Sequence, residues 1–90
     1  MKTITKKIDT EWFDMILSGK KKFELRLADF VIEDGDILRL EEWVGEGKDR
    51  KPSGRFIEKQ VRYVAKIDWK QWKEQQPELA DKGFFVIQFD

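Results

Sequence analysis

The chain contains no cysteine and no histidine among its 90 residues. Without cysteine there is no disulfide framework, no thiolate nucleophile and no thiolate metal ligand. Without histidine the chain lacks the commonest metal ligand and the usual general base near neutral pH. The sequence therefore excludes Ser/His/Asp catalysis, Cys/His catalysis and zinc binding, and we expect neither a metal nor a cofactor.

Long apolar runs are also missing. No segment approaches the ~20 apolar residues that a helix needs to cross a bilayer, and the N-terminal lysines precede no apolar run of signal-peptide length. We therefore expect no membrane partner and a cytoplasmic, reducing location. The acidic residues near position 33 lack the spacing of a calcium loop, and the segment Glu33–Asp36 is better explained as a turn that bends at Gly35.

Aromatic residues are plentiful, with four tryptophans, one tyrosine and seven phenylalanines in a chain that is 40% charged. Such large side chains can fill a compact core. The length is that of one domain, which we expect to span residues 1–90 as a monomer.

The apolar pattern predicts a strand over Thr3–Ile8 and then a helix that Asp9 or Thr10 caps. Four apolar residues recur in this helix at helical spacing and are predicted to pack inward: Trp12, Phe13, Ile16 and Leu17. Further strands are predicted at Lys22–Leu27, Ile37–Trp43, Phe56–Ile67 and Phe84–Phe89, with a long flexible connection at Val44–Gly54 and a second short helix starting at Asp68. In the predicted strand Phe56–Ile67 the alternation places Val61 and Tyr63 on the same face. This order predicts an α+β fold, a small curled sheet or barrel with two short helices.

The segment Gly19–Arg26 is the best candidate for a site. Gly19 is predicted to end the helix in a left-handed conformation, so that the following lysines leave the turn together. In a strand Glu24 and Arg26 project from one face, and Phe23, Leu25 and Leu27 are predicted to be buried on the other. The alternative is an ordinary solvated ion pair, since lysines commonly follow a helix C-terminus.

The net charge is zero, but the charges are unevenly distributed. Lys20–Arg26 and Lys48–Arg62 are basic, and Asp29–Glu46 is strongly acidic. If the two basic segments meet in the fold, they form a positive cleft beside an acidic wall, and such a cleft attracts phosphates. If they do not meet, these segments are ordinary mixed surfaces.

The pattern G-x-K-x-x-E-x-R formed by Gly19, Lys21, Glu24 and Arg26 resembles the signature of the ASCH domain family, in particular its small stand-alone branch. The segment Gly35–Leu38 and a hairpin beginning at Ser53 follow in the order seen in that branch. The resemblance covers most of the chain and implies a PUA-like β-barrel.

The resemblance also implies an RNA-directed role, with a nucleotide or single-stranded RNA element bound in a cleft. The residues that match the family motif are Lys21, Glu24 and Arg26. We expect Lys20 and Arg55 to assist them, so the predicted nucleic-acid-binding residues are Lys20, Lys21, Glu24, Arg26 and Arg55.

Two other functions remain open. Some small relatives in the superfamily are amidohydrolases of the modified nucleoside N4-acetylcytidine, in which a lysine matching Lys21 acts with a threonine where this chain has Glu24. An enzyme of this kind would use Lys21 and Glu24 as catalytic residues. The third function is a protein-interaction module that uses Trp69 and Trp72 of the second helix.

Overall fold

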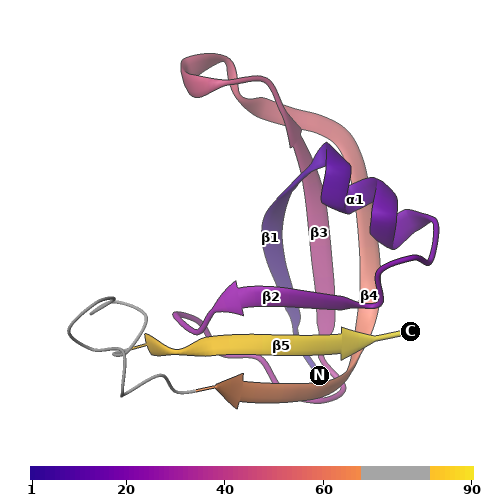
Figure 1. Ribbon diagram of the computed structural model, residues 1–90, viewed down its shortest axis with the longest axis vertical. Coiled ribbons are helices and arrows are strands. Elements are labelled where there is room, and N and C mark those ends of the chain that lie inside the picture. The colour runs from indigo at the N-terminus through magenta and orange to yellow at the C-terminus, as the bar shows by residue number, and fades with distance from the viewer. Residues whose placement is uncertain (68–81) are drawn as a thin grey trace.

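The computed structural model describes residues 1–67 and 82–90, whose five strands form one mixed sheet in the order β1-β3-β4-β5-β2 (Figure 1). The strands are β1 (Thr3–Asp9), β2 (Phe23–Leu27), β3 (Ile37–Val44), β4 (Lys51–Ile67) and β5 (Phe84–Phe89). Helix α1 (Thr10–Leu17) follows β1, and a short 3₁₀ helix η1 (Gly47–Asp49) lies between β3 and β4. Strand β1 is parallel to β3, and all other neighbouring strands are antiparallel.

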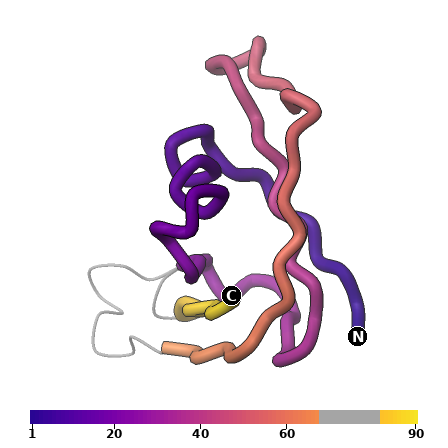
Figure 2. Tube along the Cα trace, turned by 90° about the vertical axis from the view of Figure 1, so that its right-hand side faces the viewer, coloured from indigo at the N-terminus to yellow at the C-terminus, as the bar shows by residue number. Residues whose placement is uncertain are grey.

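The long strand β4 gives the sheet its shape. Its first part pairs with β3 and its second part with β5, and the register shifts between Val61 and Tyr63. Strands β2 and β5 therefore run across the direction of β1 and β3, as Figures 1 and 2 show from two sides. The irregularity also interrupts the side-chain alternation, because Val61 is 1% exposed and Tyr63 is 56% exposed. The prediction that these two residues lie on the same face is wrong.

Helix α1 packs on the sheet through a narrow stripe. Phe13 and Ile16 are buried, whereas Trp12 and Leu17 are 44% and 60% exposed. The prediction that all four side chains pack inward is therefore wrong for Trp12 and Leu17, because a helix of two turns presents only one face to a sheet. The described core consists of Ile8, Phe13, Ile16, Ile32, Leu38, Leu40, Val61, Ile87 and Phe89.

The sheet is open, so the predicted PUA-like β-barrel is wrong. A barrel requires a hydrogen-bonded ladder between its first and last strands, but β1 and β2 are the two ends of the strand order and do not pair. The predicted second helix, with Trp69 and Trp72, lies outside the described residues.

The connection between β3 and β4 is shorter than predicted for residues 44–54. Strand β3 continues to Val44 and β4 already begins at Lys51, so the two strands form a long hairpin that projects from the body of the fold. Gly45 has a φ of 91°, and a Cβ atom there would lie 2.7 Å from the carbonyl oxygen of Asp49. This close approach explains why a glycine opens the turn.

A buried carboxylate at Asp36 holds the start of β1 against the predicted Glu33–Asp36 turn. It accepts hydrogen bonds from the main-chain amides of Lys2, at 3.1 Å, and Glu33, at 2.9 Å. The amide of Glu33 is the main cause of the lowered pKa of Asp36. Gly35 has a φ of 90°, which confirms the predicted bend.

A second buried carboxylate, Glu42, holds the hairpin against α1. Glu42 accepts a hydrogen bond of 2.6 Å from Oγ of Ser53 and bonds of 2.9 and 2.8 Å from the Arg55 guanidinium. Arg55 also reaches Asp14 on α1, at 3.1 Å. The hydrogen bonds from Arg55, then from Ser53 and Thr10, lower the pKa of Glu42 to about 2. The helix and the hairpin, two walls of the cleft described below, are thus held together.

Replacing this carboxylate is expected to make stability depend on pH in a defined window. The folded-state pKa of Glu42 is about 2 and its ordinary value is 4.5, so its contribution is present above pH 4.5 and is lost as the pH falls through about 2. Thermal melts of Glu42→Gln should lie several degrees below wild type at pH 7, and this gap should close between pH 4.5 and 2. A difference in melting temperature that stays constant with pH would contradict the lowered pKa of Glu42. The control is Glu58→Gln, at an exposed carboxylate.

Candidate functional site

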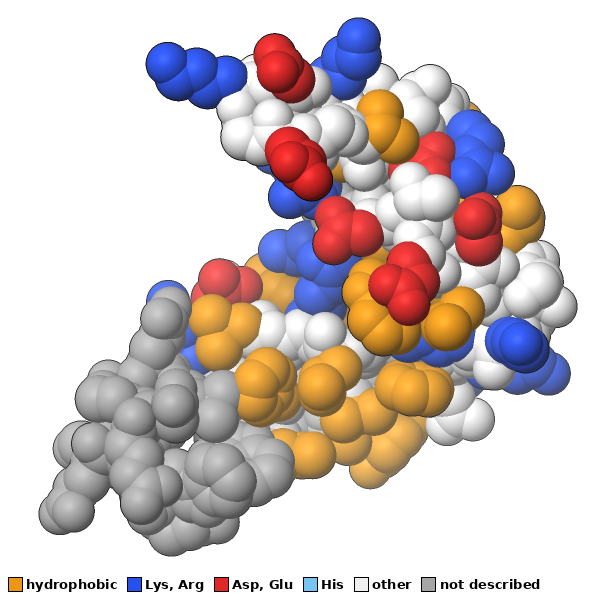
Figure 3. All heavy atoms as spheres, turned by 45° about the horizontal axis from the view of Figure 1, so that its top comes forward, with side chains coloured by type: hydrophobic (Ala, Val, Ile, Leu, Met, Phe, Trp, Pro, Cys, Tyr) orange, Lys and Arg blue, Asp and Glu red, His pale blue; other side chains and the backbone are white. Residues whose placement is uncertain are grey.

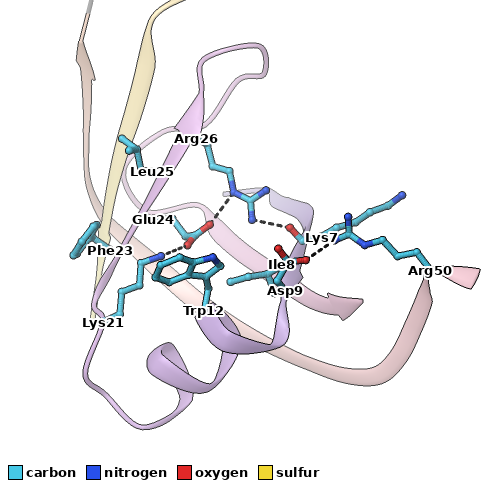
Figure 4. A pocket seen from close by; sticks show the side chains of 10 residues that line it. All are labelled: Lys7, Ile8, Asp9, Trp12, Lys21, Phe23, Glu24, Leu25, Arg26 and Arg50. Atoms are coloured by element: carbon cyan, nitrogen blue, oxygen red, sulfur yellow. Dashed lines mark hydrogen bonds and ion pairs between the residues drawn. The ribbon is translucent and has the colours of Figure 1, made fainter. Parts of the chain in front are cut away.

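An open cleft of about 680 Å³ lies between the free edges of β1 and β2. It is lined by Lys7, Ile8, Asp9, Trp12, Lys21, Phe23, Glu24, Leu25, Arg26 and Arg50. These residues come from β1, α1, the segment entering β2, β2 itself and the β3–β4 hairpin, so segments far apart in the chain meet here (Figure 4). In the space-filling view the same side of the molecule is hollowed below the hairpin, and Lys and Arg side chains gather in the hollow (Figure 3).

Glu24 lines the cleft, is the central group of a charged cluster there, and is only 3% exposed. Its Oε1 lies 2.8 Å from Nζ of Lys21, and its Oε2 lies 2.7 Å from Nε of Arg26. The side chains of Lys21 and Arg26 are 16% and 25% exposed. The three predicted site residues thus converge, and both oxygens of the carboxylate are engaged by cations.

Arg26 also connects the two edges of the sheet. Its terminal nitrogen donates a hydrogen bond of 2.7 Å to the main-chain carbonyl of Lys7 in β1. This is a side-chain bond at the position where a closed barrel would have a β1–β2 ladder. The guanidinium therefore spans the opening while leaving the cleft accessible.

The turn before β2 places Lys21. Gly19 has a φ of 82°, which confirms the predicted left-handed residue after the helix, and the amide of Lys21 donates to the carbonyl of Met15 at 3.0 Å. The chain therefore folds back against α1, so that Nζ of Lys21 lies 2.8 Å from Glu24, three residues further on.

Strand β2 has its faces reversed relative to the prediction. Glu24 is buried, whereas Phe23 and Leu25 are 49% and 54% exposed, so the expected burial of these apolar residues is wrong. The inner face of this edge strand meets the cleft, where a polar cluster replaces apolar packing. Alternation showed that the faces differ, but it did not show which of them faces inward.

Main-chain groups of β2 also line the opening. The amide of Phe89 donates to the carbonyl of Lys22, and the amide of Ala28 donates to the carbonyl of Gly83. In an antiparallel pair alternate residues bond to the partner strand, so the even-numbered residues of β2 bond to β5. The amides and carbonyls of Phe23 and Leu25 consequently point away from β5, toward the cleft that these residues line.

Trp12 supplies an aromatic surface. The residue is 44% exposed and lines the cleft, and the centroid of its ring lies 4.9 Å from Nζ of Lys21. The apolar period of α1 predicts this residue to lie in the core. Nothing in that period distinguishes a buried position from a half-exposed one at the border of the stripe.

The rim carries further charges. Arg50 of the hairpin donates a bond of 2.8 Å to Oδ1 of Asp9, at the junction of β1 and α1. The lining residues include four cations and two carboxylates, a net charge of +2. The two basic segments of the sequence therefore meet, because Arg50 lines the same cleft as Lys21 and Arg26.

Two predicted residues lie elsewhere. Lys20 is exposed and does not line the cleft, and Arg55 is bound to Glu42 and Asp14 in the clamp between the hairpin and α1. Several lining residues were not predicted, and only tertiary structure brings them together: Lys7, Ile8, Asp9, Trp12, Phe23, Leu25 and Arg50.

Acidic residues do not form a metal centre in the described part of the chain. Across residues 1–67 and 82–90, no group of three or more carboxylates is arranged to hold a metal ion. In the same residues no helix has the length and apolarity needed to cross a membrane.

Removing the central carboxylate is expected to destabilise the fold. Glu24→Ala leaves Lys21 and Arg26 partly buried without their partner, which should lower the free energy of unfolding by about 2 kcal/mol. Urea denaturation measures this change. In the control Glu58→Ala, an exposed carboxylate paired with Arg39 is removed, and the loss should stay below about 0.5 kcal/mol. Equal losses in both variants would show that the central ion pairs are ordinary surface interactions.

Comparisons with known proteins show which structures and sequences the chain resembles. The crystal structure of hypothetical protein PH0355 superposes with a TM-score of 0.70 over 100% of this chain and 98% of that chain, at 19% sequence identity, which supports a shared fold alone. An uncharacterized 12.9 kDa protein in the GpA 3′ region of Escherichia phage P2 is 39% identical over 64 residues. That match covers 70% of this chain and 55% of the phage protein, so the chain spans about half the length of this relative.

The family models give the assignment. The model for a domain of unknown function, DUF3850, matches residues 5–78 and so includes the motif in β2, α1 and the hairpin. The chain belongs to the DUF3850 family.

Proposed function

We propose that the cleft binds a nucleotide of single-stranded RNA, and that the chain is a monomeric, cytoplasmic RNA-binding domain related to ASCH domains. One observation carries the proposal: a buried carboxylate, Glu24, is held between Lys21 and Arg26 in an open cleft, beside the half-exposed ring of Trp12. The volume of about 680 Å³ is in the range of small-molecule sites.

Base recognition would use the hydrogen-bonding groups in the cleft. A lysine ammonium has three N–H donors and a guanidinium has five, so the bonds to Glu24 and to the Lys7 carbonyl leave donors on Lys21 and Arg26 for a ligand. The main-chain groups of Phe23 and Leu25 add both donors and acceptors. The edge of an unpaired base offers the complementary pattern, which is how proteins read single-stranded RNA.

Stacking would use Trp12. Bases of single-stranded nucleic acids stack on aromatic side chains, and each such contact contributes roughly 1–3 kcal/mol irrespective of sequence. Trp12 is available because 44% of it is exposed. A base placed against this ring would lie beside Lys21 and Glu24.

The charge of the cleft fits the same ligand. A net charge of +2 among the lining residues attracts a phosphodiester chain. The two carboxylates, Asp9 and Glu24, reduce the attraction for any polyanion. The site is therefore suited to a short RNA element rather than to long nucleic acids of any sequence.

An N4-acetylcytidine amidohydrolase is less well supported. Such an enzyme would need the Lys21 amine free to accept a proton or to attack the acyl carbon. Instead Nζ of Lys21 is a hydrogen-bond donor to Glu24, at 2.8 Å, and Glu24 is fully engaged by Lys21 and Arg26. Both groups would have to leave this arrangement before they could react.

RNA binding can be tested by fluorescence anisotropy with short labelled oligoribonucleotides of each base. Trp12→Ala and Arg26→Ala should each weaken the binding of the best oligonucleotide roughly tenfold, because they remove stacking and charged donors respectively. The matched control is Arg62→Ala, since Arg62 is exposed, pairs with Asp90 and does not line the cleft. Unchanged affinity in both cleft variants, with normal thermal melts, would refute the site.

Hydrolysis can be tested separately by incubating the protein with N4-acetylcytidine and following acetate release. We expect no turnover above that of Lys21→Ala, for the geometric reason given above. Turnover that disappears in Lys21→Ala, with unchanged thermal melts, would establish the amidohydrolase instead.

A further inference from the structure

We propose that the rim of the cleft contains a phosphate subsite formed by Arg50 and Lys7, and that Asp9 is a built-in competitor that holds Arg50 until a phosphate displaces it. This inference rests on the proposed function and makes it more specific. The ligand class becomes a nucleoside monophosphate unit, with the base at Glu24 and the phosphate at Arg50.

The two ends of the cleft differ in character. At one end lie the buried Glu24 and its partner Lys21, and at the other end Arg50 and Lys7 extend from the hairpin and β1 (Figure 4). Glu24 is 3% exposed, whereas the Arg50 side chain is 41% exposed. The inner end is therefore desolvated and suited to a base, and the outer end is open to solvent, where a charged phosphate keeps part of its hydration.

The ion pair between Arg50 and Asp9 is weak enough for a phosphate to replace Asp9 as the partner of Arg50. Their side chains are 41% and 65% exposed at a separation of 2.8 Å, and exposed ion pairs contribute at most about 1 kcal/mol. The phosphate monoester of a nucleoside monophosphate can accept two parallel hydrogen bonds from a guanidinium and, at neutral pH, carries more charge than a carboxylate. It should therefore compete successfully for Arg50.

Asp9 lies at a position where its carboxylate could instead cap helix α1. It is the N-cap residue of α1, and an aspartate there commonly accepts a hydrogen bond from an amide of the first turn. Its side chain makes no such bond and is directed at Arg50 instead. The carboxylate thus orients Arg50 at the rim of the cleft and contributes no side-chain cap to the helix.

Lys7 supplies the second cation. Its main-chain carbonyl is fixed by Arg26, and its Nζ lies 3.9 Å from the centroid of the Trp43 ring. Within residues 1–67 and 82–90, no carboxylate forms a salt bridge with Lys7. The ammonium charge at this rim is therefore not neutralised by an ion pair and is available to a phosphate together with Arg50.

The test is isothermal titration of the full chain with nucleosides, their 3′- and 5′-monophosphates, and inorganic phosphate. Wild type should bind the preferred monophosphate about tenfold more tightly than its nucleoside. Arg50→Ala should abolish this difference without changing nucleoside affinity. Asp9→Asn should strengthen monophosphate binding severalfold and leave nucleoside affinity unchanged, and it keeps a residue that is equally good at an N-cap.

A matched exposed pair provides the controls. Arg62 and Asp90 form an ion pair that does not line the cleft, so Arg62→Ala and Asp90→Asn should leave all affinities unchanged. Arg50→Lys should give an intermediate loss, because it keeps the charge and removes the bidentate contact.

The subsite is refuted if wild type binds nucleoside and monophosphate equally, if Arg50→Ala weakens both to the same extent, or if Asp9→Asn weakens monophosphate binding. Inorganic phosphate that binds as tightly as the nucleotides would indicate a simple anion site and would also refute the nucleotide assignment. If labelled RNA binds through Trp12 and Arg26 in any of these cases, only the subsite fails. If neither RNA nor any nucleotide binds wild type, the proposed function fails as well.

Discussion

The buried carboxylate of Glu24 is the interaction on which the arrangement of the cleft depends. A carboxylate this far from water needs opposite charge, and Lys21 and Arg26 supply it at 2.8 and 2.7 Å. Arg26 can reach Glu24 and the Lys7 carbonyl together only if β1 and β2 stay at a fixed separation. The charged cluster therefore connects the free edges of the sheet across the cleft. The polar interior of the cleft follows from this one requirement.

A second polar cluster keeps the other walls in place. Glu42 binds Ser53 and Arg55, and Arg55 reaches Asp14 on α1, so the β3–β4 hairpin is fastened to the helix. Arg50 belongs to the same hairpin and lies at the rim of the cleft because of this attachment. The two clusters differ in accessibility to a ligand, since the Glu42 cluster does not line the cleft. Arg55 thus holds the hairpin to α1, although its charge alone suggested a role in binding RNA.

Family membership and geometry give complementary information. The DUF3850 family carries no assigned activity in its description, and the similarity to a solved structure at 19% identity establishes the fold alone. The chemistry must therefore be inferred from the cleft, where the buried Glu24 and a cationic rim lie on either side of the ring of Trp12. The proposed nucleotide ligand would use all three parts, and each part can be tested by its own variant.

The local pattern of the chain was enough to predict most strands, the first helix, the left-handed Gly19 and the grouping of Lys21, Glu24 and Arg26, because these depend on short-range periods and turn chemistry. It did not predict the open sheet, the exposed Trp12 or the inward face of β2. Alternation along a strand separates two faces but does not identify the buried one. The bend in β4 determines which face of β2 points inward. It brings the edges of β1 and β2 opposite each other, so the charged face of β2 lines the cleft between them.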